Sequence, residues 1–231
     1  MAGWLGEQEW MAVALSLRVA FWATLLSLPV GLATAYVLAR KSFPGKQIVN
    51  GLVHLPLILP PVVTGYLLLL TFGTKGPIGG ALEQVGIVLA FRWTGAALAA
   101  AVMAFPLMVR AMRLSLEAVD PKLEEAAATL GASRFWVFVT VTLPLVLPGI
   151  LAGAVLAFAK AMGEFGATIT FVSNIPGQTQ TLPSAVYAFL QVPGGESAAM
   201  RLVIVSIVIA MSALILSEWL ARRLARRAGG A

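Results

Sequence analysis

Long apolar runs of about 20 residues constrain this chain more than any other feature of its sequence. Each run is long enough to cross roughly 30 Å of hydrocarbon as one helix, and backbone groups in a bilayer must bond within their own segment. Of the 231 residues, 59% are hydrophobic and 11% are charged, whereas a soluble domain is roughly a quarter charged. The sequence therefore predicts an all-α integral membrane protein with one domain over residues 1–231.

The apolar runs predict five membrane-spanning helices. They cover residues 19–39, 48–72, 94–116, 145–172 and 200–221. Two shorter segments are candidates for a sixth span. Residues 4–18 mix acids with tryptophans, as is typical of a membrane interface, and residues 81–91 are too short to span unless they are re-entrant.

Basic residues at the ends of the runs predict the orientation, because Lys and Arg are enriched in cytoplasmic loops. One side of the predicted spans holds Arg40, Lys41, Lys46, Arg110, Arg113, Lys122, Arg134, Arg222, Arg223, Arg226 and Arg227. The other side holds only Lys75, Arg92 and Arg201. This split places the N-terminus outside and the C-terminus in the cytoplasm. It also explains the net charge of +6 as topology, so nucleic acid is not an expected partner.

The connection between the third and fourth runs, residues 120–144, carries a dense set of helix-boundary signals. Asp120 before Pro121 is typical of a helix start, because the carboxylate accepts orphan backbone N–H groups and proline has none to leave unpaired. Gly131 can adopt the left-handed conformation that ends a helix, and Ser133 is a candidate cap for a second helix. The pattern predicts an elbow of two short helices on the cytoplasmic side.

Seven positions of this elbow stand at a fixed spacing: Glu125, Ala126, Ala127, Gly131, Val141, Leu143 and Pro144. They resemble the loop shared by the permease subunits of ABC importers, with Val141 where the family usually has isoleucine. The resemblance implies the type I importer permease fold, in which this loop is a coupling helix that docks on an ATP-hydrolysing subunit. It implies an ATPase contact made by Glu124 together with the motif residues.

The resemblance covers nearly the whole chain and narrows to the molybdate permease subunits. It rests on residues 43–68, 105–110 and 163–185. The last stretch is also similar in sulfate permeases, and tungstate has the shape and charge of molybdate, so the anion stays open.

The resemblance also implies the assembly. Two copies of this chain would form the pore in a bacterial inner membrane, with two ABC ATPase subunits below them and an extracytoplasmic molybdate-binding protein above. The chain itself contains no Gly-x-x-x-x-Gly-Lys-Ser/Thr phosphate loop, so we expect ATP hydrolysis in the partner and no enzyme here. It has no His/Cys cluster, and neither a metal nor another cofactor is expected.

Two groups of residues are candidates for the pore or its gate. Prolines 60 and 61 interrupt the second run, which frees carbonyls that a water-lined cavity can satisfy. Lys160 and Glu164 are one helical turn apart and are expected to pair, because an isolated charge in hydrocarbon is costly. The full candidate set is Pro60, Pro61, Thr64, Lys160, Gly163, Glu164, Gly166 and Thr168.

Two other classes of membrane protein remain as alternatives. An ion-coupled secondary carrier would typically show internal repeats and charged residues at the bilayer midplane, and the sequence has no clear repeat. A membrane scaffold without transport is the third possibility.

Overall fold

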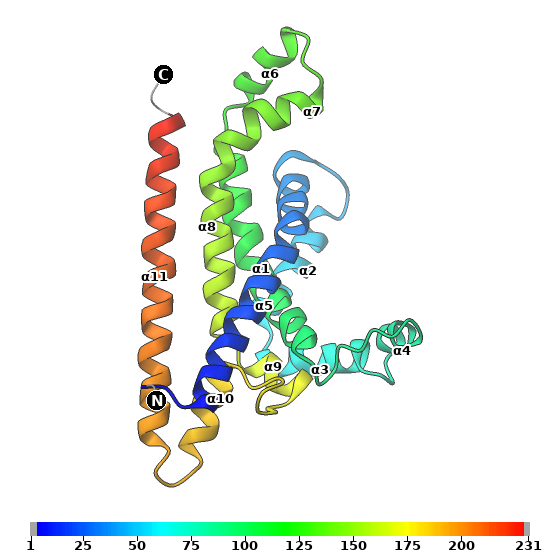
Figure 1. Ribbon diagram of the computed structural model, residues 1–231. Helices are drawn as coiled ribbons and strands as arrows, with labels where there is room; N and C mark the ends of the chain where they lie inside the picture. Colours follow the sequence, from blue (N-terminus) through cyan, green and yellow to red (C-terminus); the bar gives the residue numbers. More distant parts are fainter. Residues whose placement is uncertain (1–3, 229–231) are drawn as a thin grey trace.

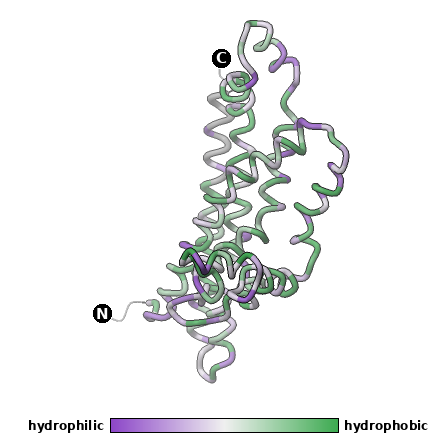
Figure 2. The backbone as a smooth tube through the Cα atoms, turned by 90° about the vertical axis from the view of Figure 1, so that its right-hand side faces the viewer, coloured by the Kyte–Doolittle hydropathy of each residue, from purple (hydrophilic) through white to green (hydrophobic). Residues whose placement is uncertain are grey.

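The computed structural model describes residues 4–228, and within them the chain forms helices and loops without a strand. Four long helices run between the two ends of the molecule, and the chain termini lie at opposite ends (Figure 1). These helices are α1 (Glu7–Arg40), α5 (Trp93–Glu117), α8 (Leu143–Met162) and α11 (Glu196–Ala228). Hydrophilic residues gather towards the two ends, as Figure 2 shows, so the apolar middle matches a bilayer.

Shorter helices connect the long ones. At the end near the N-terminus lie α3 (Pro61–Phe72), α4 (Pro77–Gln84), α9 (Gly166–Val172) and α10 (Leu182–Leu190). At the opposite end lie α6 (Pro121–Thr129), α7 (Arg134–Val137) and a π-helical turn, η1 (Phe138–Thr142). Helix α2 (Lys46–Ile58) descends from that end toward α3 (Figure 1).

The expected five spans are found, although one of them is not a single rod. Within the described residues, four helical stretches are long and apolar enough to cross a membrane: Glu7–Arg40, Trp93–Glu117, Arg134–Met162 and Glu196–Leu216. Counted as one broken span, the bent pair α2 and α3 brings the number to five. Neither candidate for a sixth span forms one.

Helix α5 is the centre of the bundle, because small side chains let its neighbours approach closely. Its apolar window is 61% buried, against 11% for α11. The alanines of α5 pack with α1, α3 and α9 in one apolar cluster, and Met108 and Met112, nearer the elbow, pack with α1 and α8 in a second. Helix α11 packs on α8 and α10 and leaves most of the surface of its apolar stretch exposed.

The N-terminal piece, expected as a separate interfacial segment over residues 4–18, is instead the start of α1. Helix α1 has 34 residues and is therefore about 51 Å long. The helix continues through Arg18, whose guanidinium lies over the Trp93 ring, 3.8 Å from its centroid.

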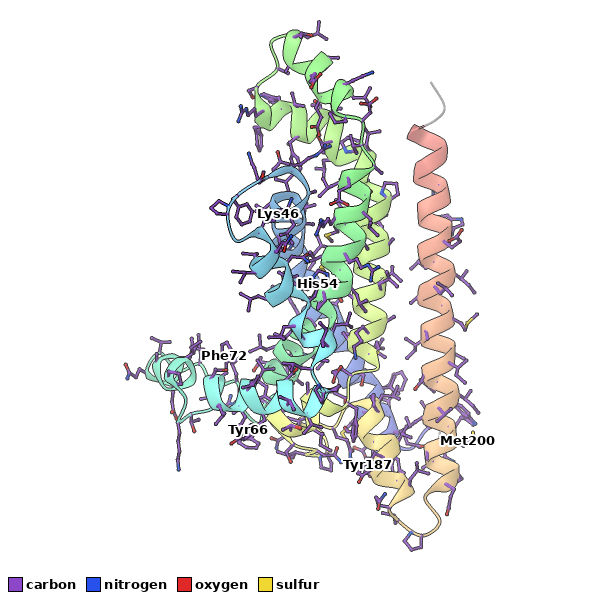
Figure 3. All side chains as sticks on the ribbon, turned by 180° about the vertical axis from the view of Figure 1, so that it is seen from behind. Lys46, His54, Tyr66, Phe72, Tyr187 and Met200 are labelled. Carbon is purple, nitrogen blue, oxygen red and sulfur yellow. The ribbon has the colours of Figure 1, made fainter. Side chains whose placement is uncertain are left out.

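The second predicted run, residues 48–72, breaks after Ile58, and α2 and α3 meet at 113°. Leu59 has a ψ of 145° and Pro60 a ψ of 134°. Both precede a proline, which disfavours helical geometry in the preceding residue. The two consecutive prolines thus turn the chain sideways into the arm formed by α3 and α4. Figure 3 places Phe72 where α3 reaches its outer end.

The fourth predicted run, residues 145–172, also breaks. Helix α8 ends at Met162, and α9 begins at Gly166 after an irregular turn. Glu164 lies in that turn, so the expected pair with Lys160 does not sit on one continuous helix. The short apolar piece expected over residues 81–91 is mostly irregular, because α4 ends at Gln84.

Candidate functional site

The elbow at the end away from the N-terminus has the two helices and the caps that the sequence predicts. Asp120 Oδ1 accepts the Lys122 backbone N–H at 2.9 Å, and Ser133 Oγ accepts that of Trp136 at 3.4 Å. Between the two helices Gly131 has a φ of +87°. This conformation is available to glycine at little cost and disfavoured for residues with a Cβ, so Gly131 sets the angle of the elbow.

The two neighbouring glutamates of the elbow have different environments. Glu124 Oε1 accepts from Arg40 Nη2 at 3.0 Å and from Thr142 Oγ1 at 2.7 Å. Arg40 is the last residue of α1, and Thr142 is the last residue of η1. Glu124 therefore ties α6 to the ends of two long helices. Glu125 is exposed, with no hydrogen bond or ion pair in the described part of the chain.

Large apolar side chains stand exposed on the elbow. Leu130 is 89% exposed, Phe135 70% and Trp136 59%. Ala126 is exposed and Ala127 is half-buried. An apolar patch on a projecting polar segment is typical of a protein-contact surface. Of the three remaining motif residues, Val141 is half-buried, Leu143 packs on the core beneath the elbow, and Pro144 is exposed at the start of α8.

At the other end, Lys160 and Glu164 form the expected pair. Lys160 Nζ donates to Glu164 Oε2 at 2.7 Å. The Ala167 backbone N–H donates to Glu164 Oε1 at 3.0 Å. Glu164 is almost fully buried while Lys160 keeps 30% of its side chain exposed. The carboxylate thus caps the first turn of α9 and fixes the junction between α8 and α9.

Helix α9 lies against α3, and two glycines allow the contact. A Cβ on Gly65 would stand 2.5 Å from the carbonyl oxygen of Ala167, and one on Gly166 would stand 2.8 Å from Pro61 Cβ. The backbones of the two helices therefore nearly touch. Gly65 was not among the predicted site residues, although a glycine inside an apolar run is a signal for such an approach.

The other pore candidates divide between this junction and its surroundings. Thr64 on α3 and Thr168 on α9 are buried, and Thr64 Oγ1 has no hydrogen-bond partner among the described residues. Pro60 is exposed at the bend before α3, and a Cβ at Gly163 would meet only its own helix. Gly163 therefore ends α8 without making a close contact.

Comparison with known proteins places this architecture. A family model described as "Binding-protein-dependent transport system inner membrane component" matches residues 27–227, a range that contains the elbow and the junction of α8 with α9. The chain belongs to this family. It is an ABC importer permease of type I, as the elbow motif predicts.

Among curated proteins, the "Molybdenum transport system permease protein ModB" of Escherichia coli is 62% identical over 226 residues, which are 97% of this chain and 99% of that protein. Its namesake in Haemophilus influenzae is 56% identical over 96% of this chain and 97% of its own length. The "Sulfate transport system permease protein CysW" of Synechococcus elongatus is 40% identical over 74% of this chain and 60% of its own length.

Solved structures share the fold at low sequence identity. A bacterial ABC transporter "involved in the import of the acidic polysaccharide alginate" superposes with a TM-score of 0.74 at 18% identity, covering 94% of this chain and 80% of that one. The fold is therefore shared with permeases of importers that transport other substrates.

Proposed function

We propose that this chain is the membrane permease subunit of an ATP-driven molybdate importer. The observation that supports molybdate as the substrate is the 62% sequence identity to a permease named for molybdenum transport, over nearly the full length of both chains. The match to the sulfate permease is weaker and covers less of the chain. Two copies form the pore, two ATPase subunits bind below, and an extracytoplasmic molybdate-binding protein delivers the anion from above.

The elbow is the docking surface for the ATPase subunit. Ala126 and the exposed apolar side chains enter a groove of the partner, and Glu125 offers a charge at the edge of the contact. Glu124 performs a different task, because its carboxylate already bonds within this subunit. It passes movement of α6 to α1 through Arg40 and to α8 through Thr142 and η1.

The α3–α9 contact and the end of α8 form the gate region at the outer side. Glu164 forms an ion pair with Lys160, and the lysine side chain remains partly exposed. The ion pair holds the end of α8 at the first turn of α9, and Glu164 stays buried as the residue that positions α9. Strong binding is left to the extracytoplasmic protein, because a permease needs only a transient path.

The substrate is tested by ATP hydrolysis in the reconstituted complex. The complex of this chain, its ATPase and its binding protein is assayed in liposomes with molybdate, tungstate and sulfate in turn. Molybdate should stimulate hydrolysis and accumulate inside, and sulfate should do so much less. Stimulation of hydrolysis by sulfate alone would contradict the assignment of molybdate as the substrate. Uptake without the ATPase subunit would favour an ion-coupled carrier.

The orientation is tested by labelling. With the elbow in the cytoplasm, a cysteine at Ser133 should react with a membrane-impermeant maleimide only after the membrane is opened. A cysteine at Ser197, near the start of α11, should react in intact spheroplasts. The chain has no native cysteine, so the background is clean. Reaction of both positions from the same side would contradict the proposed topology.

A further inference from the structure

A basic cavity opens at the end of the molecule opposite the elbow. It has a volume of about 650 Å³ and lies between α1 and the loop that leads into α5, with Arg18, Arg92, Trp93 and Gln178 among its lining residues and no Asp or Glu. Arg18 is held flat against the Trp93 ring. Neither guanidinium has a hydrogen bond or an ion pair in the described part of the chain. The cavity therefore offers two unpaired cations to an anion.

An apolar groove continues directly from this cavity. It has a volume of about 450 Å³ and is lined by apolar side chains of α1, α3 and α5, including Trp22 and Phe72. Leu89, Trp93 and Thr94 line both spaces. Thr94 Oγ1 is buried there without a hydrogen-bond partner among the described residues. The combined site is thus positive at one end and apolar at the other.

The depth of the site matches the boundary of a bilayer. Arg18 precedes Arg40 by 22 residues on α1, which is about 33 Å of helix. Trp93 precedes Arg113 by 20 residues on α5, or about 30 Å. Since the hydrocarbon core is roughly 30 Å thick, Arg18 and Trp93 stand at one boundary when Arg40 and Arg113 stand at the other. Lipid phosphates lie at this level.

We propose that this site binds one anionic phospholipid. Its phosphate lies between Arg18 and Arg92, and one acyl chain occupies the groove between α1 and α5. A small soluble oxyanion accounts for the arginines but leaves the apolar groove unfilled, whereas a phospholipid matches both halves. The proposal stands on these cavities and does not depend on which anion is transported.

The test is retention of lipid by the purified protein. Wild type and variants are placed in nanodiscs of equal phosphatidylglycerol and phosphatidylcholine, and native mass spectrometry counts the lipids that stay bound. Wild type should retain phosphatidylglycerol over phosphatidylcholine. Arg18→Gln and Arg92→Gln should each reduce this preference about fivefold, and the double variant should abolish it.

Lys75→Gln is the matched control, because Lys75 is an exposed cation in the loop between α3 and α4, at the same end. It should keep the wild-type preference. Arg92 is exposed and unpaired, so its replacement should not disturb folding. Absence of a preference in the wild type, or an unchanged preference in the double variant, would overturn the proposal. Displacement of the lipid by millimolar molybdate or phosphate would assign the arginines to a soluble anion instead.

Discussion

Replacing Gly65 by alanine should abolish molybdate-stimulated transport. The new methyl group would stand 2.5 Å from the carbonyl oxygen of Ala167 and 2.8 Å from its Cα, whereas ordinary contacts begin at 3.4 Å. Both atoms belong to backbone, so α3 and α9 must move apart by close to 1 Å. Overpacking of this kind costs roughly 1–3 kcal/mol, and it falls on the junction that we propose as the gate.

Gly51→Ala is the control for this change. Gly51 lies on α2, in the other half of the same broken span, and a Cβ there would meet no atom within 4 Å. Alanine also favours a helix over glycine by about 1 kcal/mol, so this variant should melt at or above the wild-type temperature and transport normally. Thermal melting in detergent and uptake in liposomes are measured for both. Wild-type uptake by Gly65→Ala would show that the α3–α9 contact is not critical.

Ala126→Trp should separate ATP hydrolysis from transport. Ala126 is exposed on α6, so the larger side chain has room within this subunit and clashes only with a partner that packs against the elbow. Ala127 is half-buried, so a larger side chain there could clash within this subunit as well as with the partner. We expect the variant to insert and assemble as a dimer but to bind the ATPase subunit about 5- to 150-fold more weakly, as a clash of 1–3 kcal/mol requires.

Lys122→Ala is the matched change for the elbow, because Lys122 is exposed in the first turn of the same helix. Its loss should leave ATPase binding within about twofold of wild type, in keeping with the small contribution of exposed charges. Pull-down of the ATPase subunit and hydrolysis stimulated by the loaded binding protein are measured for both variants. Normal coupling in Ala126→Trp would mean that the elbow docks through another face.

Local signals predicted the elbow well. The caps at Asp120 and Ser133 and the left-handed Gly131 are found where the sequence places them. Such features depend on residues a few positions apart, so an isolated sequence contains all the information. The apolar runs of α5 and α11 were predicted for a similar reason, because length and composition alone decide them.

Two of the differences involve contacts between distant segments, and a third is local. Arg18 suggested the end of an interfacial piece, but α1 continues through it, and its guanidinium lies over the ring of Trp93, 75 positions away. The prolines at 60 and 61 predicted a bend, but not that α3 would lie against α9 after a turn of 113°. No spacing rule contains these two partners. The local difference is at Glu164, which suggested one turn of a continuous helix, whereas its carboxylate caps α9 three residues further on.

The unequal burial of α5 and α11 implies unequal freedom for their sequences to drift. Most of the apolar stretch of α11 is exposed on the outside of this subunit, so an exchange among leucine, isoleucine, valine and methionine there disturbs no packing within the subunit. Each added methyl group on the inner face of α5 would meet a neighbouring helix, because alanines such as Ala96 and Ala100 are completely buried. The two helices are thus under different constraints. The side chains of α11 must remain hydrophobic, whereas the side chains on the inner face of α5 must remain small.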